Sequence, residues 1–314
     1  MKPLALVLYA ESRFTPWKEN IDLETVKWFS ASIPEEYETA IVHMVEPSAE
    51  LLELLLQADI VFNLCYGFGA YSQAEVAAWL EHGQVNHLSS GAVAQLNAQD
   101  KMFVADLCFE QNITSPETLR IITEDKYEKY IVKPRFGGCH RNISIFTYQE
   151  LKDIFHTIDP LEYVVQPYIK GREFSVGVLP KTNGTGYETL TPVEIKPFPP
   201  RDLYVAGSSF GTTVREFNPD LDENLDENLR NIALKVHNLL GLKYFSRVDF
   251  RVANGVCYVL DVNTMPNMHP QKSLIPAMLQ NDHMPLNDFI VRLIELNKRI
   301  SSVNLTKLNA HVLN

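Results

Sequence analysis

The sequence predicts an α/β protein built from three units, and three observations support this. Over the first hundred residues, short apolar segments alternate with helical patterns, which is typical of a parallel sheet covered on both faces by helices. The length of 314 residues is enough for two or three compact units. The apolar content of 46% and the charged content of 21% are ordinary for a globular protein.

The first unit is expected to span residues 1–98. Its strands are predicted at residues 4–9, 40–45 and 59–64, and its helices at residues 22–31, 48–57 and 72–82. Ser72 is an N-cap candidate, because a serine hydroxyl can accept a hydrogen bond from a free N–H of the first helical turn. The apolar run from Leu4 to Leu8 is too short for a signal peptide or a membrane span, so it is interpreted as a buried strand.

The second unit is expected at residues 99–180 and the third at residues 181–314. The second has predicted helices at 99–111 and 148–157, and predicted strands at 118–122, 130–134, 142–146, 162–169 and 173–178. The third has a helix at 223–240, a hairpin at 245–263 and a helix at 285–299. Residues 196–218 are rich in Pro, Gly and Ser, and a long loop of this kind is often functional.

The overall charge and the cysteines limit the partners and the compartment. Lys and Arg number 28 against 39 Asp and Glu, a formal net charge of −11. This balance argues against nucleic acid and against an anionic membrane as partners. The four cysteines form no CxxC or zinc-like cluster, so we expect reduced thiols and a cytoplasmic protein.

The most informative segment is the hairpin from Arg247 to Asn263. Side chains alternate between the two faces of a strand, and the even-numbered residues of both arms are apolar. Both arms bury this face only if the connecting loop has an odd number of residues. A two-residue Asn254-Gly255 turn is usual for this dipeptide, but it would expose half of the apolar set. We therefore predict a three-residue loop, Ala253-Asn254-Gly255.

With that loop, Asp249, Asp261 and Asn263 converge on one face of the hairpin, and Arg247 lies beside them. Two carboxylates and an amide oxygen are hard ligands that suit Mg²⁺, which proteins usually hold with a few oxygens together with substrate phosphate. Taken alone, the same pattern also fits a solvated polar face on a half-buried sheet.

The segment Asp261 to Met268, preceded by Arg247-Val248-Asp249, resembles the metal site of the D-alanine–D-alanine ligase branch of the ATP-grasp superfamily. Other segments resemble this family in the same order and spacing: Ser90 to Lys101, Ile131 to Pro134, and Gln166 to Phe174. The resemblance covers about residues 59 to 299. It implies a Rossmann-like N-terminal domain followed by a two-subdomain ATP-grasp fold that holds ATP between the subdomains.

The resemblance also implies a role for individual residues. Lys101 and Lys133 would neutralise ATP phosphates, Gly138 would let backbone N–H groups approach them, and Glu173 would accept hydrogen bonds from the ribose. Adenine would lie against Gln166, Pro167, Tyr168 and Ile169. The metal ligands would be Asp249, Asp261 and Asn263. The catalytic positions would be Arg247, Lys133, Asn267 and Ser273, with Arg247 stabilising a charged intermediate.

The family's reaction has two steps. A carboxylate attacks the γ-phosphate of ATP to give an acylphosphate, and an amine then displaces the phosphate, with Mg²⁺ (or Mn²⁺ as a substitute) offsetting charge. The resemblance thus implies amino-acid or peptide substrates, D-alanyl-D-alanine as the leading product, and allows a homodimer. Two alternatives stay open: an ATP-grasp enzyme that uses another nucleophile or cyclises its substrate, and a non-catalytic ATP-binding protein.

Several positions depart from the family pattern. The usual glutamate for the first substrate's ammonium falls near Phe14, which leaves Glu11 or Glu19 as substitutes. The His-Gly segment reads Tyr66-Gly67, Asn267 replaces a glycine, and Tyr9 and Tyr71 add aromatic bulk. No lid motif is recognisable in residues 196–218, where Lys196 and Arg201 are the candidate cations. We therefore expect a ligase with a changed substrate and poor activity with D-alanine alone.

Overall fold

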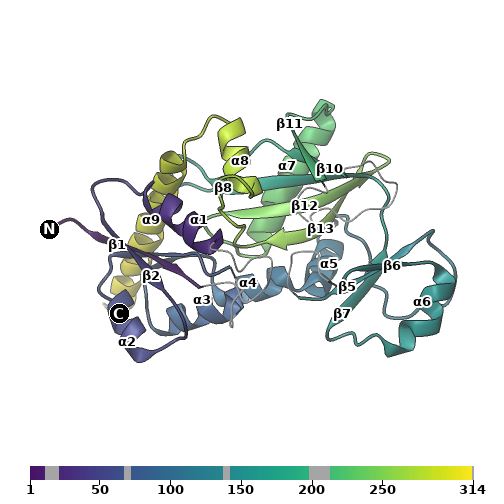
Figure 1. Ribbon diagram of the computed structural model, residues 1–314, viewed down its shortest axis with the longest axis horizontal. Helices are drawn as coiled ribbons and strands as arrows, with labels where there is room; N and C mark the ends of the chain where they lie inside the picture. Colours follow the sequence, from purple (N-terminus) through teal and green to yellow (C-terminus); the bar gives the residue numbers. More distant parts are fainter. Residues whose placement is uncertain (11–20, 67–71, 137–141, 198–212, 313–314) are drawn as a thin grey trace.

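The computed structural model describes residues 1–10, 21–66, 72–136, 142–197 and 213–312. Within these ranges it has three sheets arranged in a row (Figure 1). The N-terminal sheet lies at one end, a small sheet at the other, and the largest sheet between them. Helices accompany each sheet, so the predicted α/β class is confirmed.

The N-terminal sheet is parallel, with the strand order β2-β1-β3-β4. Its strands are β1 (Leu4–Tyr9), β2 (Glu38–His43), β3 (Ile60–Asn63) and β4 (His87–Leu88). Its helices are α1 (Ile21–Ser30), α2 (Ala49–Leu55) and α3 (Gln73–His82). Ser72 caps α3 as predicted, in a reciprocal capping box with Glu75.

The predicted helix at 99–111 is confirmed as α5 (Lys101–Glu110), and a separate helix that was not predicted, α4 (Ala92–Gln99), precedes it. Asp100 breaks the run, because its backbone is extended and its carboxylate accepts hydrogen bonds from the N–H groups of Met102 and Phe103. The sequence prediction missed α4 and the break that separates it from α5. The break makes Lys101 the first residue of α5, at the edge of the central cleft described below.

The small sheet is antiparallel, with the order β6-β5-β7. Its strands are β5 (Tyr130–Pro134), β6 (Ser144–Phe146) and β7 (Tyr163–Pro167). Between β6 and β7 the chain forms α6 (Tyr148–Ile154) and the 3₁₀ turn η1 (Phe155–Thr157). The strand predicted at 118–122 is wrong, because this segment is irregular and makes only an isolated backbone hydrogen bond, from Leu119 to Val165.

The largest sheet has the order β11-β10-β8-β12-β13, with β9 paired to β8. Its strands are β8 (Arg172–Pro180), β9 (Tyr187–Thr189), β10 (Val193–Pro197), β11 (Thr213–Phe217), β12 (Ser246–Ala253) and β13 (Val256–Asn263). Helix α7 (Glu223–Leu239) packs on one face. Strand β8 belongs to this sheet although residues 99–180 were assigned to the second unit. The unit boundaries at 98 and 180 stay predictions.

The two ends of the chain share one apolar core, which we call the joint core. Val7 and Phe62 of the N-terminal sheet lie in the same cluster as Met278 of α8 (Leu274–Asn281) and as Phe289 and Leu293 of α9 (Leu286–Val312). Figure 1 shows α9 beside the N-terminal sheet. Helix α9 extends beyond the predicted end at 299. None of the helices in the described ranges is long and apolar enough to cross a membrane.

The hairpin of β12 and β13 differs from the prediction at its turn. Asn254 and Gly255 both have positive φ angles, 51° and 76°, and Ala253 pairs with Val256, so the turn has two residues. A β-bulge then shifts the register, because Asp249 pairs with Asp261 while Phe250 pairs with Val259. The three-residue loop was wrong, and the bulge supplies the extra residue instead.

The bulge changes which apolar side chains of β13 are buried. Near the turn the odd-numbered Cys257 and Val259 lie in the core, with exposed fractions of 5% and 1%. Val256 is exposed at 39%, and Leu260 lines the central cleft instead of the core. Beyond the bulge the even-numbered Val262 is buried again. The predicted apolar face therefore holds along β12 but only at the far end of β13.

Candidate active site

The central cleft lies between the small sheet and the largest sheet. Strands β5 and β7 form one wall and β8, β12 and β13 the other. Its lining residues are Pro116, Ile131, Lys133, Ile143, Gln166, Pro167, Tyr168, Ile169, Glu173, Asp249, Arg251, Leu260 and Asp261. Most of the predicted nucleotide residues and both predicted metal carboxylates therefore face the same space.

Hydrogen bonds tie the end of β7 and the residue after it to one wall of the cleft. The buried Gln166 side chain donates to the carbonyl of Pro116 and to the Thr118 hydroxyl, both at 3.3 Å. The backbone N–H of Tyr168 donates to the carbonyl of Lys129 at 2.9 Å. Ile131 of the neighbouring strand β5 lines the same wall and gives it an apolar surface. A flat apolar slot with a few fixed polar groups is the usual form of a nucleobase pocket.

Glu173 lies buried in the cleft and pairs with Arg251. The Glu173 carboxylate accepts a hydrogen bond from Nη2 of Arg251 at 2.6 Å. Burial raises the pKa of Glu173 to about 7, while the Arg251 charge acts in the opposite direction. Arg251 was not predicted as a site residue, although its odd position on β12 placed it on the polar face with Asp249.

Two lysines from different elements meet one carboxylate. Nζ of Lys101 lies 3.6 Å, and Nζ of Lys133 3.8 Å, from Oδ1 of Asp261. The backbone N–H of Lys101 donates to the carbonyl of Arg135 at 3.1 Å, which fixes the start of α5 beside the end of β5. Lys133 is 5% exposed, and burial lowers its pKa while Asp261 opposes this. Such a pair can bind a polyanion such as phosphate.

The predicted metal residues lie together on the polar face of the hairpin. Asp249 is directly opposite Asp261, and Arg247 is opposite Asn263. The Asp249 carboxylate accepts from Nε and Nη2 of Arg247 at 2.8 and 2.9 Å, and from Nδ2 of Asn263 at 2.8 Å. It also accepts from the hydroxyl of Ser175 at 2.6 Å. Ser175, on β8, was not predicted.

The donor set on this face suits a hard cation. No group of three or more His, Cys, Asp or Glu side chains that could hold a metal ion occurs among the described residues, so a site here would need other ligands as well. Asp249 and Asp261 on adjacent strands, with the amide of Asn263, instead offer oxygen ligands beside the two lysines. Mg²⁺ prefers one or two carboxylates combined with substrate phosphate, and these residues fit that requirement.

The loop between β13 and α8 is organised by its own side chains. Oδ1 of Asn267 accepts from the backbone N–H of His269 at 2.7 Å and from the hydroxyl of Ser273 at 2.9 Å. The imidazole of His269 accepts from two backbone N–H groups of the loop and bonds Glu24 of α1 at 3.2 Å. The side-chain oxygen of Asn267 is therefore occupied within the loop. The catalytic roles of Asn267 and Ser273 stay predictions.

The first-substrate region is only partly described. The hydroxyl of Tyr66 accepts from the backbone N–H of Met268 at 3.3 Å, which brings the substituted His-Gly segment to the loop after β13. Tyr9 stacks on His43 with ring centroids 4.8 Å apart, so it packs against β2. Outside the described residues lie Glu11, Phe14, Glu19, Gly67, Tyr71, Gly138, Arg201 and residues 198–212.

The position of Lys196 does not fit the lid role predicted for its positive charge. It ion-pairs with Glu194 and Glu216. Strand pairing places these residues on the face of the sheet opposite Glu173, because Glu173 is paired with Ile195. The sequence could not predict the face on which Lys196 lies, because residues 196–218 were interpreted as a loop without a strand pattern.

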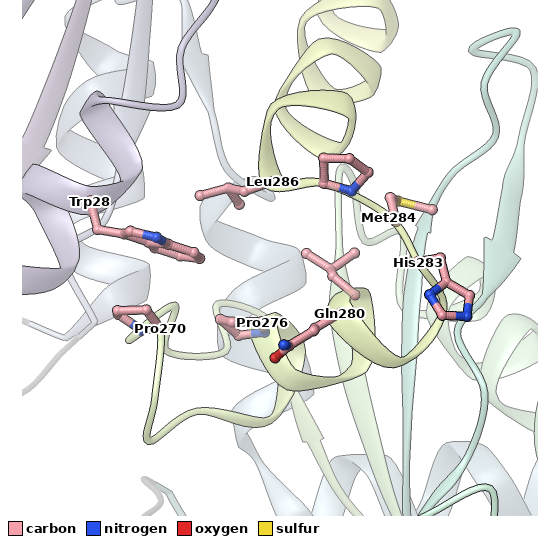
Figure 2. A pocket seen from close by; sticks show the side chains of 9 residues that line it. Trp28, Pro270, Pro276, Gln280, His283, Met284 and Leu286 are labelled. Atoms are coloured by element: carbon pink, nitrogen blue, oxygen red, sulfur yellow. The ribbon is translucent and has the colours of Figure 1, made fainter.

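A second, more open hollow lies between α1, α8 and the start of α9. Figure 2 shows Trp28 facing Pro270 and Pro276 across it, with Gln280 and Leu286 at its sides. Its lining is mainly apolar and includes none of the predicted nucleotide, metal or catalytic residues. The predicted nucleotide residues and metal carboxylates therefore gather at the cleft between the sheets and not at this hollow.

Comparisons with known proteins identify the family. The family model for the D-ala D-ala ligase C-terminus matches residues 122–295. A D-alanine–D-alanine ligase of Fervidobacterium nodosum is 31% identical over 245 residues, covering 69% of this chain and 75% of the relative. D-alanine–D-alanine ligase B of Clostridium perfringens is 28% identical, covering 85% of this chain and 90% of the relative.

Solved structures agree on the fold. The D-alanine–D-alanine ligase from Bacillus anthracis complexed with ATP superposes with a TM-score of 0.73 at 20% identity, covering 96% of this chain and 99% of that chain. The VanG D-Ala:D-Ser ligase from Enterococcus faecalis gives a TM-score of 0.75 at 16% identity, covering 94% and 99%. This chain belongs to the D-alanine–D-alanine ligase family, and it is an ATP-dependent ligase with the ATP-grasp fold that forms carbon–nitrogen bonds.

Proposed function

We propose that this protein joins the carboxylate of an amino acid or peptide to an amine through an acylphosphate, with Mg²⁺ (or Mn²⁺) as the metal. The observation that carries the proposal is the meeting of Lys101, Lys133 and the two aspartates of the hairpin in one cleft. A phosphate group there would meet two lysine charges and the oxygen ligands for its metal.

Each part of the cleft has a separate task in this proposal. Adenine lies in the slot beside Gln166 to Ile169, and Glu173 accepts from the ribose hydroxyls. Lys101 and Lys133 neutralise phosphates, and Asp249, Asp261 and Asn263 hold the metal. Bound Mg²⁺ would offset the charge that develops on the transferred phosphoryl group. Arg247 lies beside Asp249 and stabilises the oxyanion formed when the amine attacks.

The amino-acid substrates are the part of the proposal that departs from the relatives, which are D-alanine–D-alanine ligases. D-alanyl-D-alanine is the product that the family suggests first. The aromatic Tyr66 at the loop after β13, and Asn267 bonded within that loop, support a first-substrate site of different shape. We therefore expect better activity with another amino acid as one partner than with D-alanine alone. The homodimer also stays a prediction.

An amino-acid screen tests the function. ADP release is measured with ATP, Mg²⁺ and pairs drawn from the L- and D-amino acids, and product masses are read for the active pairs. A mass equal to the two amino acids minus water is the expected result. ATP turnover that no amino acid stimulates would contradict the ligase proposal. Robust D-alanyl-D-alanine synthesis at millimolar D-alanine would contradict only the changed substrate.

The affinity for ATP should depend on pH through Glu173. Ribose hydroxyls donate to a carboxylate, so ATP binds best when Glu173 is ionised. Because its pKa is raised to about 7 in the free protein, the carboxylate is largely protonated below that pH. The Kd for ATP should therefore rise as the pH falls through about 7 and level off above it. Titration calorimetry between pH 5.5 and 8.5 measures this.

The matched variant is Glu173→Gln, which keeps the shape and an acceptor oxygen but cannot titrate. Its Kd for ATP should be higher at pH 8 and should change less with pH than the Kd of the parent protein. An equally steep pH dependence in Glu173→Gln would assign the effect to another group and would contradict the role given to Glu173.

A further inference from the structure

Arg215 is a cation on the same face of the largest sheet as the cleft residues. Strand pairing connects it to the cleft, because Arg215 is opposite Ile195 and Ile195 is opposite Glu173. Directly opposed residues of antiparallel strands point to the same face. Arg215 therefore shares the face of Glu173 at a distance of two strand spacings, roughly 10 Å. It was not among the predicted site residues.

The guanidinium of Arg215 reaches the loop that precedes α8. Nη1 donates to the carbonyl of Ser273 at 3.3 Å, and Nη2 donates to the carbonyl of Lys272. Ser273 in turn bonds Asn267, so the guanidinium lies against the loop that carries two of the predicted catalytic residues. Both groups that accept from Arg215 are neutral carbonyls, and its side chain is half-buried.

Each of the other described cations of the cleft has a carboxylate partner on this face. Arg247 pairs with Asp249, Arg251 with Glu173, and the two lysines share Asp261. Among the described residues, no carboxylate lies within ion-pair distance of Arg215. Burial lowers the pKa of Arg215, and so does the nearby positive charge of Arg247. A desolvated cation beside another cation is stabilised by an anion that enters from outside.

We infer that Arg215 binds an oxyanion carried by the substrates during turnover, which is either the phosphoryl group transferred from ATP or the carboxylate of the amine substrate. This rests on the proposed function. Both sources present the flat array of oxygens that a guanidinium recognises with paired hydrogen bonds. Arg215 also lies within residues 196–218, the range in which the sequence predicted Lys196 and Arg201 as candidate lid cations.

Three variants separate charge from structural bridging. Arg215→Gln keeps an N–H donor for a loop carbonyl but removes the charge, and Arg215→Lys keeps the charge without the fork. Arg230→Gln is the matched control, because Arg230 is also half-buried and donates to a carbonyl, that of Leu190, but lies on α7 against the other face. The probes are ATP with Mg²⁺, the most active amino-acid pair of the screen, and the carboxamide of its amine partner.

The expected result is a fall in kcat/KM of about tenfold or more in Arg215→Gln, a smaller fall in Arg215→Lys, which keeps the charge but not the fork, and values close to the parent protein in Arg230→Gln. A raised KM for the amine substrate, with lost preference for the free acid over the carboxamide, identifies the carboxylate as the bound group. A lower kcat that is equal for both amine substrates identifies the phosphoryl group.

Two results would overturn the inference. One is Arg215→Gln with all kinetic parameters within about twofold of the parent. The other is an equal loss in Arg215→Gln and Arg215→Lys together with a lower melting temperature, which would leave bridging of the loop as the only role. Absence of amino-acid-dependent ADP release in the parent protein would instead overturn the proposed function, and this inference with it.

Discussion

Replacing Asp261 by asparagine is expected to reduce turnover by at least about 100-fold, because the change removes a proposed metal ligand while keeping the side-chain volume. The same change should have the opposite effect on nucleotide binding without metal. Asp261 lies 3.6 and 3.8 Å from the two lysine Nζ atoms and competes with phosphate for them. In EDTA, ATP should therefore bind more tightly to Asp261→Asn than to the parent protein.

The measurements are ADP release across a Mg²⁺ titration and calorimetric ATP binding in EDTA. Asp226→Asn is the matched control, because Asp226 also pairs with a basic side chain, Arg230, but on α7. The melting temperature should stay close to that of the parent in both variants. Near-normal turnover in Asp261→Asn, with an unchanged Mg²⁺ midpoint, would remove this residue from the metal site.

Replacing Arg247 by lysine should lower kcat by about 10²–10³-fold with little change in either KM, because the lost interaction is expected mainly in the transition state. Charge is conserved in this variant. The paired donors of the guanidinium are lost, however, and Arg247 uses two of its nitrogens to hold both oxygens of Asp249. A lysine cannot keep that geometry while also facing an oxyanion.

Steady-state kinetics with the most active amino-acid pair gives kcat and both KM values. Arg230→Lys serves as the control, since Arg230 also bonds a neighbouring aspartate through Nε. A raised KM for ATP with an unchanged kcat would show that Arg247 contributes to ground-state binding of the nucleotide instead. In that case the oxyanion role would have to be given to another group.

The hairpin shows what a sequence pattern can and cannot predict. The alternation of apolar residues predicted that Asp249 and Asp261 share a face, and they are directly opposed. The predicted three-residue loop was wrong, because a β-bulge, and not the turn, brings the two aspartates to the same face. Leu260 is apolar whether it faces the core or the cleft, so alternation alone cannot locate the bulge.

Side-chain contacts between residues far apart in the sequence were the other feature that the sequence could not predict. Asp100 is an ordinary helical residue in the pattern, and only its cap contacts and its pairing with Arg135 reveal the break between α4 and α5. The pairing of Arg251 with Glu173 joins residues 78 positions apart. Such a contact depends on which strands are neighbours, and that order is not encoded in any one segment.

The joint core has a consequence for how the chain is made. Val7 and Phe62 are synthesised long before Phe289 and Leu293, which share their cluster. At ordinary elongation rates the interval is on the order of tens of seconds. During that time one face of the nascent N-terminal sheet lacks its final cover and can bind chaperones or other chains. A nascent chain stalled before α9 would therefore hold an incomplete first domain, although every residue of that domain had already been translated.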